Sequence, residues 1–171
     1  MRHSLARGAR LEQGFTLLEL LVGIGIIAFL LLMVMPSIRV YLLDTKIRSA
    51  AQAYYDGAQL ARSEALRRNT DVTITLEDNN RSWVVAAAGT AIAAKASESA
   101  AMLTVTASTE TVTFNGLGNA SAANTVKFMP GDSAQCLSSG AQRCLNIVVS
   151  QGGQVRLCDP SITTDGDNRK C

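Results

Sequence analysis

The sequence has very few of the groups that enzymes use for acid–base or metal chemistry. Its only histidine, His3, lies among the first residues, and none follows. From Phe15 onward this excludes a histidine-dependent triad, a histidine general base and a histidine metal ligand. No glycine-rich phosphate loop follows a predicted strand, and the carboxylates are scattered. We therefore predict no enzymatic activity, no metal and no cofactor.

An excess of charge of either sign is also lacking once residues 1–14 are set aside. The chain has 16 basic and 14 acidic residues, and three arginines and one glutamate fall in that first segment. The remainder is balanced at 13 of each sign. Overall basicity therefore gives no argument for nucleic-acid binding, and any such site has to be a local patch.

What the sequence does contain is one long apolar run behind a basic leader. Residues 15–35 are apolar apart from Thr16 and Glu19. As a helix the run would be roughly 32 Å long, and a hydrocarbon core is about 30 Å thick. The arginines before it would stay on the cytoplasmic side, and the rest of the chain would then be delivered across the membrane. We expect a single membrane-spanning helix.

One acid inside this run, Glu19, needs a partner. A charge in a membrane span costs on the order of 2.5 to 3.5 kcal/mol on insertion scales. No A-x-A pattern for ordinary signal peptidase follows the run, which continues into Pro36. An ordinary signal anchor with one tolerated acid is the alternative interpretation.

The segment GFTLLELLVGIGIIAFLLLMVMP, residues 14–36, resembles the class III signal of type IV prepilins and type II secretion pseudopilins. The resemblance implies that a prepilin peptidase cuts after Gly14 and N-methylates Phe15. It places Glu19 where the family keeps its acid and Pro36 at a helix-bending position. The new amine at Phe15, with a pKa near 7.7 to 8.0, would lie about one helical turn from Glu19 or face it from a neighbouring subunit. Phe15, Glu19 and Pro36 are thus the predicted assembly residues.

Beyond Pro36 the pattern becomes that of an amphipathic helix ending near Asn69. Its apolar stripe recurs at spacings of three and four. The members of the stripe are Val40, Leu43, Ile47, Ala50, Tyr54, Ala58, Ala61 and Ala65. We expect Tyr54 to Ala65 to pack on the chain's own sheet, and Phe15 to about Leu43 to pack on the helices of other subunits.

The rest of the chain has the alternating pattern of strands. Strands are expected near residues 72–76, 82–85, 103–106, 111–114, 125–128, 145–149 and 155–157. Residues 78–80 predict a turn, and residues 151–153 a second one that uses glycine at positive φ. Residues 86–101, mostly alanine and small polar side chains, are expected to form a flexible loop or an irregular helix.

Cysteine is confined to the last quarter of the chain. The four residues are Cys136, Cys144, Cys158 and Cys171. They lack the close pairs of zinc sites, and in the periplasm disulfides are the natural interpretation. Three pairings exist and the sequence does not decide between them. We favour Cys136 with Cys144, and Cys158 with Cys171, which would tie down the polar tail. Strand alternation places Cys144 and Cys158 on the face opposite the apolar one.

Two further segments resemble the GspH/FimT branch of this family: ARSEALRRNTDVTITL, residues 61–76, and RCLNIVVSQGGQVRLCDP, residues 143–160. The resemblance implies a type IV pilin-like α+β fold, a long N-terminal helix packed on an antiparallel β-sheet. The expected parts are a cleaved leader (1–14), a transmembrane and assembly helix (15–36), an amphipathic helix (37–69) and a periplasmic sheet region (70–171). Residues 37–171 would form one globular domain. Within the first segment, Arg62 and Glu64 are interpreted as a solvated face rather than a docking site.

Some minor pilins of the FimT type are DNA receptors with a G-R-x-R motif in this hairpin. Here Gln154 stands at the first arginine position and Arg156 at the second. Arg143, Arg169 and Lys170 would have to complete a patch for double-stranded DNA, against three aspartates in the same tail. A solvated mixed-charge tail is the favoured alternative.

The resemblance implies a structural function with other pilins as partners. The leading hypothesis is a minor pilin that helps initiate or cap a type IV pilus. The alternatives are an H-type pseudopilin of a type II secretion system and a DNA receptor at the pilus tip.

Overall fold

The structure is a computed structural model that describes residues 15–96, 103–131, 136 and 143–171. It describes no side chain at residues 34–37 and 39. The chain divides into two compact units, Met1–Ile38 and Arg39–Cys171, which are treated separately below.

One helix, α1 (Leu17–Arg68), runs from the first unit into the second. It ends at Asn69, whose φ of +51° is left-handed, and the Thr70 N–H donates to the Ala65 carbonyl at 3.3 Å. This is the hydrogen bond of a Schellman C-cap. Arg67 and Arg68 lie in the last turn, where positive charge is favoured by the helix dipole. The predicted end of the helix at Asn69 is confirmed.

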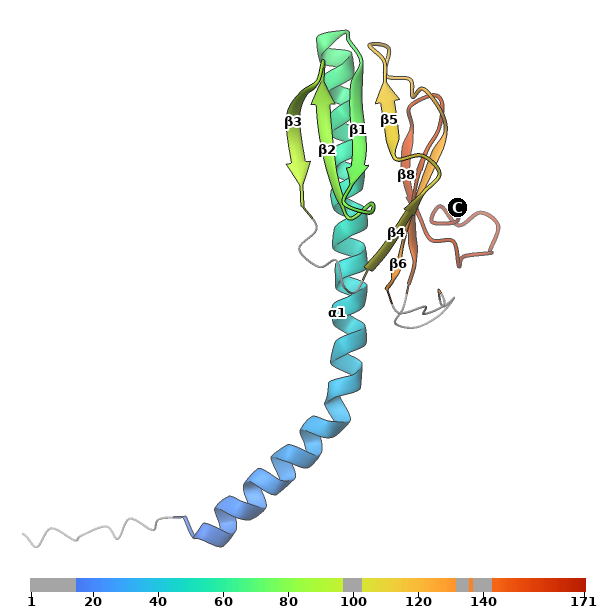
Figure 1. Ribbon diagram of the computed structural model, residues 1–171. Coiled ribbons are helices and arrows are strands. Elements are labelled where there is room, and N and C mark those ends of the chain that lie inside the picture. Colours follow the sequence, from blue (N-terminus) through green and yellow to red (C-terminus); the bar gives the residue numbers. More distant parts are fainter. Residues whose placement is uncertain (1–14, 97–102, 132–135, 137–142) are drawn as a thin grey trace, which may run out of the picture. The chain divides into compact units, whose positions relative to one another are not determined.

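The second unit contains two antiparallel four-stranded sheets among its described residues (Figure 1). The first has the order β3-β2-β1-β5 and the second the order β4-β6-β7-β8. The strands are β1 (Val72–Glu77), β2 (Ser82–Ala87), β3 (Thr90–Lys95), β4 (Leu103–Ala107), β5 (Thr111–Phe114), β6 (Asn124–Pro130), β7 (Leu145–Val149) and β8 (Val155–Cys158). The predicted fold class, a long helix with antiparallel sheet, is confirmed, although the sheet is divided in two.

The core lies between α1 and both sheets. Six helix residues at spacings of three and four are 0–1 % exposed: Ile47, Ala51, Tyr54, Ala58, Ala61 and Ala65. Valine, isoleucine and phenylalanine side chains from both sheets belong to the same buried cluster. Alanine leaves room for strands to approach the helix closely. The prediction that Tyr54 to Ala65 packs on the chain's own sheet is confirmed.

The expectation for residues 86–101 is wrong where it falls on described residues 86–96. Residues 86–87 complete β2, and a two-residue turn at Ala88 (φ +47°) and Gly89 (φ +76°) leads into β3. This turn suits the twist of a hairpin, and β3 takes its register from β2, with Val84 opposite Ala94. Alanine is a poor strand former, so the pairing with β2 overrides local propensity. Residues 97–101 lie outside the described part of the chain.

The hairpin of β7 and β8 is built as predicted. Gly153 has a φ of +74°, and its N–H donates to the Ser150 carbonyl at 2.9 Å, so the turn over residues 151–153 is confirmed. Ile147 and Val149 face the core. Cys144 and Cys158 are also buried, at 1 % and 2 % exposure, but neither belongs to that core cluster.

Candidate functional site

The first turn of α1 holds Glu19, the acid that the sequence singled out. The Thr16 hydroxyl accepts a hydrogen bond from the Glu19 N–H (3.2 Å), and the Thr16 carbonyl accepts one from the Leu20 N–H (3.1 Å). Thr16 is therefore the N-cap, and T-x-x-E is the spacing of a capping box. A carboxylate in the first turn is also favoured by the helix dipole. Thr16 was not among the predicted site residues, although this spacing before an apolar run is a recognised signal.

The structure describes only some of the predicted processing and assembly residues. Gly14 lies outside the described residues, and Phe15 is 84 % exposed. No described residue forms a hydrogen bond or ion pair with the Glu19 carboxylate. Pro36 lies inside α1, but its side chain is not described. The cleavage site, the pairing of Glu19 with the amine of Phe15 and the bend at Pro36 therefore stay predictions.

Apolar side chains are exposed on every side of α1 between Leu17 and Met33. The large ones are 53–76 % exposed. A helix that is apolar all round is stable only in apolar surroundings, whether lipid or other helices. Within the described ranges of the chain, no helix is long and apolar enough to cross a membrane. The membrane-spanning role of residues 15–36 stays a prediction.

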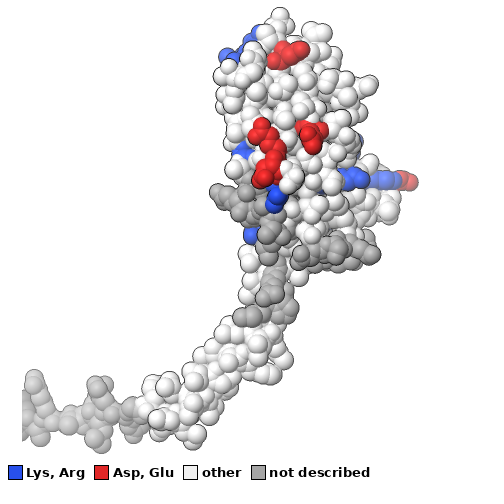
Figure 2. Space-filling model, viewed as in Figure 1, with Lys and Arg blue, Asp and Glu red and all other residues white. Residues whose placement is uncertain are grey.

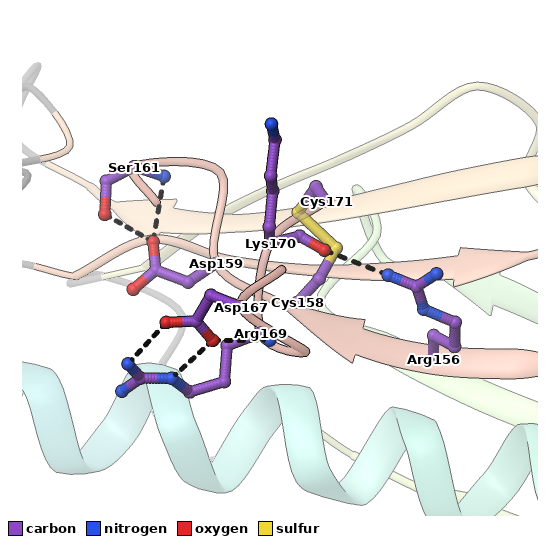
Figure 3. The surroundings of a disulfide bond; sticks show 8 residues. All are labelled: Arg156, Cys158, Asp159, Ser161, Asp167, Arg169, Lys170 and Cys171. Atoms are coloured by element: carbon purple, nitrogen blue, oxygen red, sulfur yellow. Dashed lines mark hydrogen bonds and ion pairs between the residues drawn. A yellow bond between two sulfur atoms is a disulfide. The ribbon is translucent and has the colours of Figure 1, made fainter. Parts of the chain in front are cut away.

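The C-terminal tail is tied to the second sheet. Disulfides join Cys136 to Cys144 and Cys158 to Cys171, the same pairs that were favoured from the sequence. The Asp159 N–H donates to the Arg169 carbonyl at 2.7 Å, so the end of the tail runs beside the end of β8 (Figure 3). The tail is thus held both covalently and by backbone hydrogen bonding.

The cations of this tail are mostly bound within the protein. Arg156 donates from Nη2 to the Lys170 carbonyl at 2.9 Å (Figure 3). Arg169 forms two bonds to the carboxylate of Asp167, at 2.8 and 3.1 Å, which lower the pKa of Asp167 to about 2. The Lys170 ammonium pairs with Asp165. Folding the tail back therefore brings its aspartates along with its cations.

The remaining predicted DNA contacts belong to other parts of the unit. The Arg143 N–H donates to Asp44 of α1 at 3.0 Å, and Arg143 lines a cavity of about 250 Å³ together with Arg169. Gln154 lies in the β7–β8 turn, where its N–H donates to the Ser150 hydroxyl at 3.2 Å. The DNA-binding role of these five residues stays a prediction. On the face shown in Figure 2, acidic side chains gather in the middle and basic ones are scattered.

Arg62 joins α1 to the loop between β5 and β6. Its Nε donates to the Gly118 carbonyl at 3.1 Å. Gly153 packs so closely on the same carbonyl that a Cβ there would overlap it. The Gly118 carbonyl thus meets the helix and the β7–β8 turn at one point. Arg62 is half-buried, so its interpretation as part of a solvated face is wrong.

Glu64 does not pair with Arg62 either. Its carboxylate accepts hydrogen bonds from Arg67 at 2.7 and 3.0 Å and from Arg68 at 2.7 Å. These arginines lower the pKa of Glu64 to about 2. The two charged residues of the A-R-S-E-A stretch therefore have separate structural roles.

Two family models match the chain. The one described as type II transport protein GspH matches residues 50–153, and the one described as the prokaryotic N-terminal methylation motif matches residues 9–35. Among curated protein sequences none matches the chain.

Several solved structures share the fold. The type IV minor pilin FimU of Pseudomonas aeruginosa is 22 % identical over 71 % of this chain and 94 % of its own, with a TM-score of 0.56. A second crystal form of FimU is 20 % identical over 69 % of this chain and 97 % of its own, with a TM-score of 0.52. The minor pseudopilin EpsH from the type 2 secretion system of Vibrio cholerae is 14 % identical over 67 % of this chain and 98 % of its own, with a TM-score of 0.52. At these identities the likeness is one of fold.

Proposed function

Because the chain belongs to the GspH family of pilin-like structural proteins, we propose that it is a minor pilin of a type IV pilus. In this proposal α1 enters the filament through residues 15–36. The unit Arg39–Cys171 lies at or near the tip, where it helps to initiate or cap the filament.

The observation that carries the proposal is the exposure of the apolar N-terminal part of α1. Large side chains from Leu17 to Met33 are more than half exposed, although the rest of the helix buries its own apolar stripe. Such a surface requires partners, and helices of the same kind in other subunits provide them. Glu19, in the first turn, would align this helix with its neighbours.

Processing follows from the same proposal. The methylation motif over residues 9–35 supports cleavage after Gly14 and N-methylation of Phe15 by a prepilin peptidase. Before assembly the protein would sit in the inner membrane with its β-sheet unit in the periplasm. Both disulfides suit that oxidising compartment.

The alternative is an H-type pseudopilin of a type II secretion system. The description of the matching family and the shared fold of EpsH favour it, whereas the disulfide-tied tail favours the pilus. DNA reception at the tip is a weaker candidate, because the tail cations are largely engaged by carboxylates and a carbonyl.

Deleting the gene and measuring twitching with surface piliation, exoprotein release and transformation distinguishes the three candidate functions. Loss of twitching and of surface pili, with normal exoprotein release, is expected for a minor pilin. Loss of exoprotein release with normal twitching would overturn the proposal in favour of a pseudopilin. Loss of transformation with intact pili would point to DNA reception.

A further inference from the structure

Two leucines are exposed where α1 ends. Leu66 lies in the last turn of the helix and is 49 % exposed, and Leu117 lies in the loop between β5 and β6 and is 77 % exposed. Among the described residues beyond Leu42, no other large apolar side chain is as exposed. The proposed function uses neither leucine.

Close packing of the loop on the helix brings the two leucines together. A Cβ at Gly118 would lie 3.1 Å from the Leu66 side chain, and a Cβ at Gly116 would lie 2.6 Å from the side-chain oxygen of Asn69. Leu117 stands between these two glycines, at the closest approach of the loop to the end of α1. Leu66, Leu117 and the two glycines form one surface, which we call the helix-end surface.

Hydrogen bonds fix the backbone on both sides of Leu117. The side-chain oxygen of Asn115 accepts from the Leu117 and Asn119 N–H groups, both at 3.0 Å. The Gly118 N–H donates to the Asn115 carbonyl at 2.8 Å, and the Asn115 N–H donates to the Asn119 carbonyl at 2.9 Å. Because the loop is already ordered, binding through Leu117 would cost little conformational entropy.

Positive charge is in excess around the helix-end surface. The last two turns of α1 and the link to β1 contain three arginines and two acids: Arg62, Glu64, Arg67, Arg68 and Asp71. Glu64 binds both Arg67 and Arg68, and the side chain of Arg67 is still 64 % exposed. A partner with a carboxylate beside an apolar pocket would complement this arrangement.

The cavities of this chain do not offer such a pocket. One of about 370 Å³ has Lys46, Arg81 and Lys95 and no acid among its described lining residues. The smaller cavity near Arg143 has three arginines against two aspartates. Neither complements a surface with excess positive charge, which favours a different protein over a second copy as the partner.

We propose that the helix-end surface docks a neighbouring subunit of the filament, a different pilin-like protein with an apolar pocket and an acidic rim. Leu117 enters the pocket, Leu66 packs at its edge, and Arg67 pairs with a carboxylate of the rim. This inference rests on the proposed function. It adds a contact made by the β-sheet unit to those made by residues 15–36.

Photocrosslinking from position 117 tests the contact in living cells. A strain lacking the native gene expresses the full chain with Leu117→p-benzoylphenylalanine, and mass spectrometry identifies the crosslinked protein. The expected product contains a different pilin-like subunit, and it should be lost when the same crosslinker replaces Thr106, an exposed residue of β4. A crosslink to a second copy or to a protein of another kind, no product, or equal product from both positions would each overturn the proposal.

Leu117→Asp distinguishes failure of this inference from failure of the proposed function. It places a carboxylate against an acidic rim, and the yield of sheared filaments should fall at least about tenfold. Leu117 is largely exposed, so thermal unfolding should not change, and Thr106→Asp should leave filaments normal. If deleting the gene abolishes filaments but Leu117→Asp does not reduce them, the docking proposal is wrong and the proposed function stands. Normal filaments after gene deletion would overturn the proposed function itself.

Discussion

Two stretches of α1 differ in the exposure of their apolar side chains. From Leu17 to Met33 the helix is apolar on all sides and its large side chains are 53–76 % exposed. From Ile47 to Ala65 it has one stripe, mainly alanine, that is 0–1 % exposed and packs on two sheets. Both stretches are rich in apolar residues. The distribution of those residues around the helix, and their size, distinguish a surface made for other molecules from one made for the chain's own core.

The largest expected effect concerns the exposed stretch, whose assembly role requires cleavage of the leader after Gly14. Gly14→Ala should leave the leader attached, so that no free amine forms at Phe15. The measurement is the mass of the protein recovered from cells. Gly25→Ala is the matched control, because a Cβ at Gly25 meets nothing within 4 Å. A mature mass for Gly14→Ala would contradict the cleavage assignment.

The next largest effect is expected when one alanine of each stretch is enlarged, because only the buried stretch should lose stability. Ala58 is fully buried, and Ala58→Leu is expected to destabilise the protein by about 1 to 3 kcal/mol through overpacking. Ala28 is exposed, and Ala28→Leu should leave thermal unfolding of the sheet unit unchanged. Equal melting temperatures for the two variants would show that the buried stripe is not tightly packed.

A smaller effect is expected at Arg62, which joins the buried stretch to the loop between β5 and β6. Arg62→Ala removes the bond to the Gly118 carbonyl and should cost about 1 to 2 kcal/mol. Arg67→Ala removes the ion pair between a largely exposed arginine and Glu64 and should cost less than Arg62→Ala. Chemical denaturation measures the free energy of unfolding of both variants. A larger loss of stability in Arg67→Ala than in Arg62→Ala would contradict the structural role of Arg62.

The smallest expected effect is on acid stability. The arginines beside Glu64 and Asp167 lower both pKa values to about 2, whereas unfolded carboxylates titrate near about 4. Each charged carboxylate therefore stabilises the fold above pH about 4, and this contribution is lost as the pH falls toward 2. Glu64→Gln should flatten the dependence of the urea midpoint on pH in that window. An unchanged profile would show that the pairing does not persist in solution.

Side-chain pattern was enough to predict the helix, its end at Asn69, the buried stripe and most strands. It failed at Thr90–Lys95, because alanine carries no strand signal and the pairing with β2 is a long-range effect. Gly89 at a two-residue turn was the local signal for that hairpin.

In the candidate site, too, some features follow from the local sequence and others only from the tertiary structure. Glu19 stood out because a charge in an apolar run is rare, while its capping partner Thr16 was overlooked. The contact from Arg62 to Gly118 spans 56 positions, and no local pattern announces it. The cavity near Lys46, Arg81 and Lys95 likewise forms only when α1 and both sheets come together.

In the proposed function, the exposed stretch of α1 serves assembly through Glu19. The most direct test expresses Glu19→Ala in a strain lacking the native gene and measures the protein in sheared filaments by quantitative mass spectrometry. Normal membrane levels with little or no protein in filaments are expected, whereas Glu77→Ala, an exposed acid of β1, should be incorporated normally. Undiminished incorporation of Glu19→Ala would contradict the account.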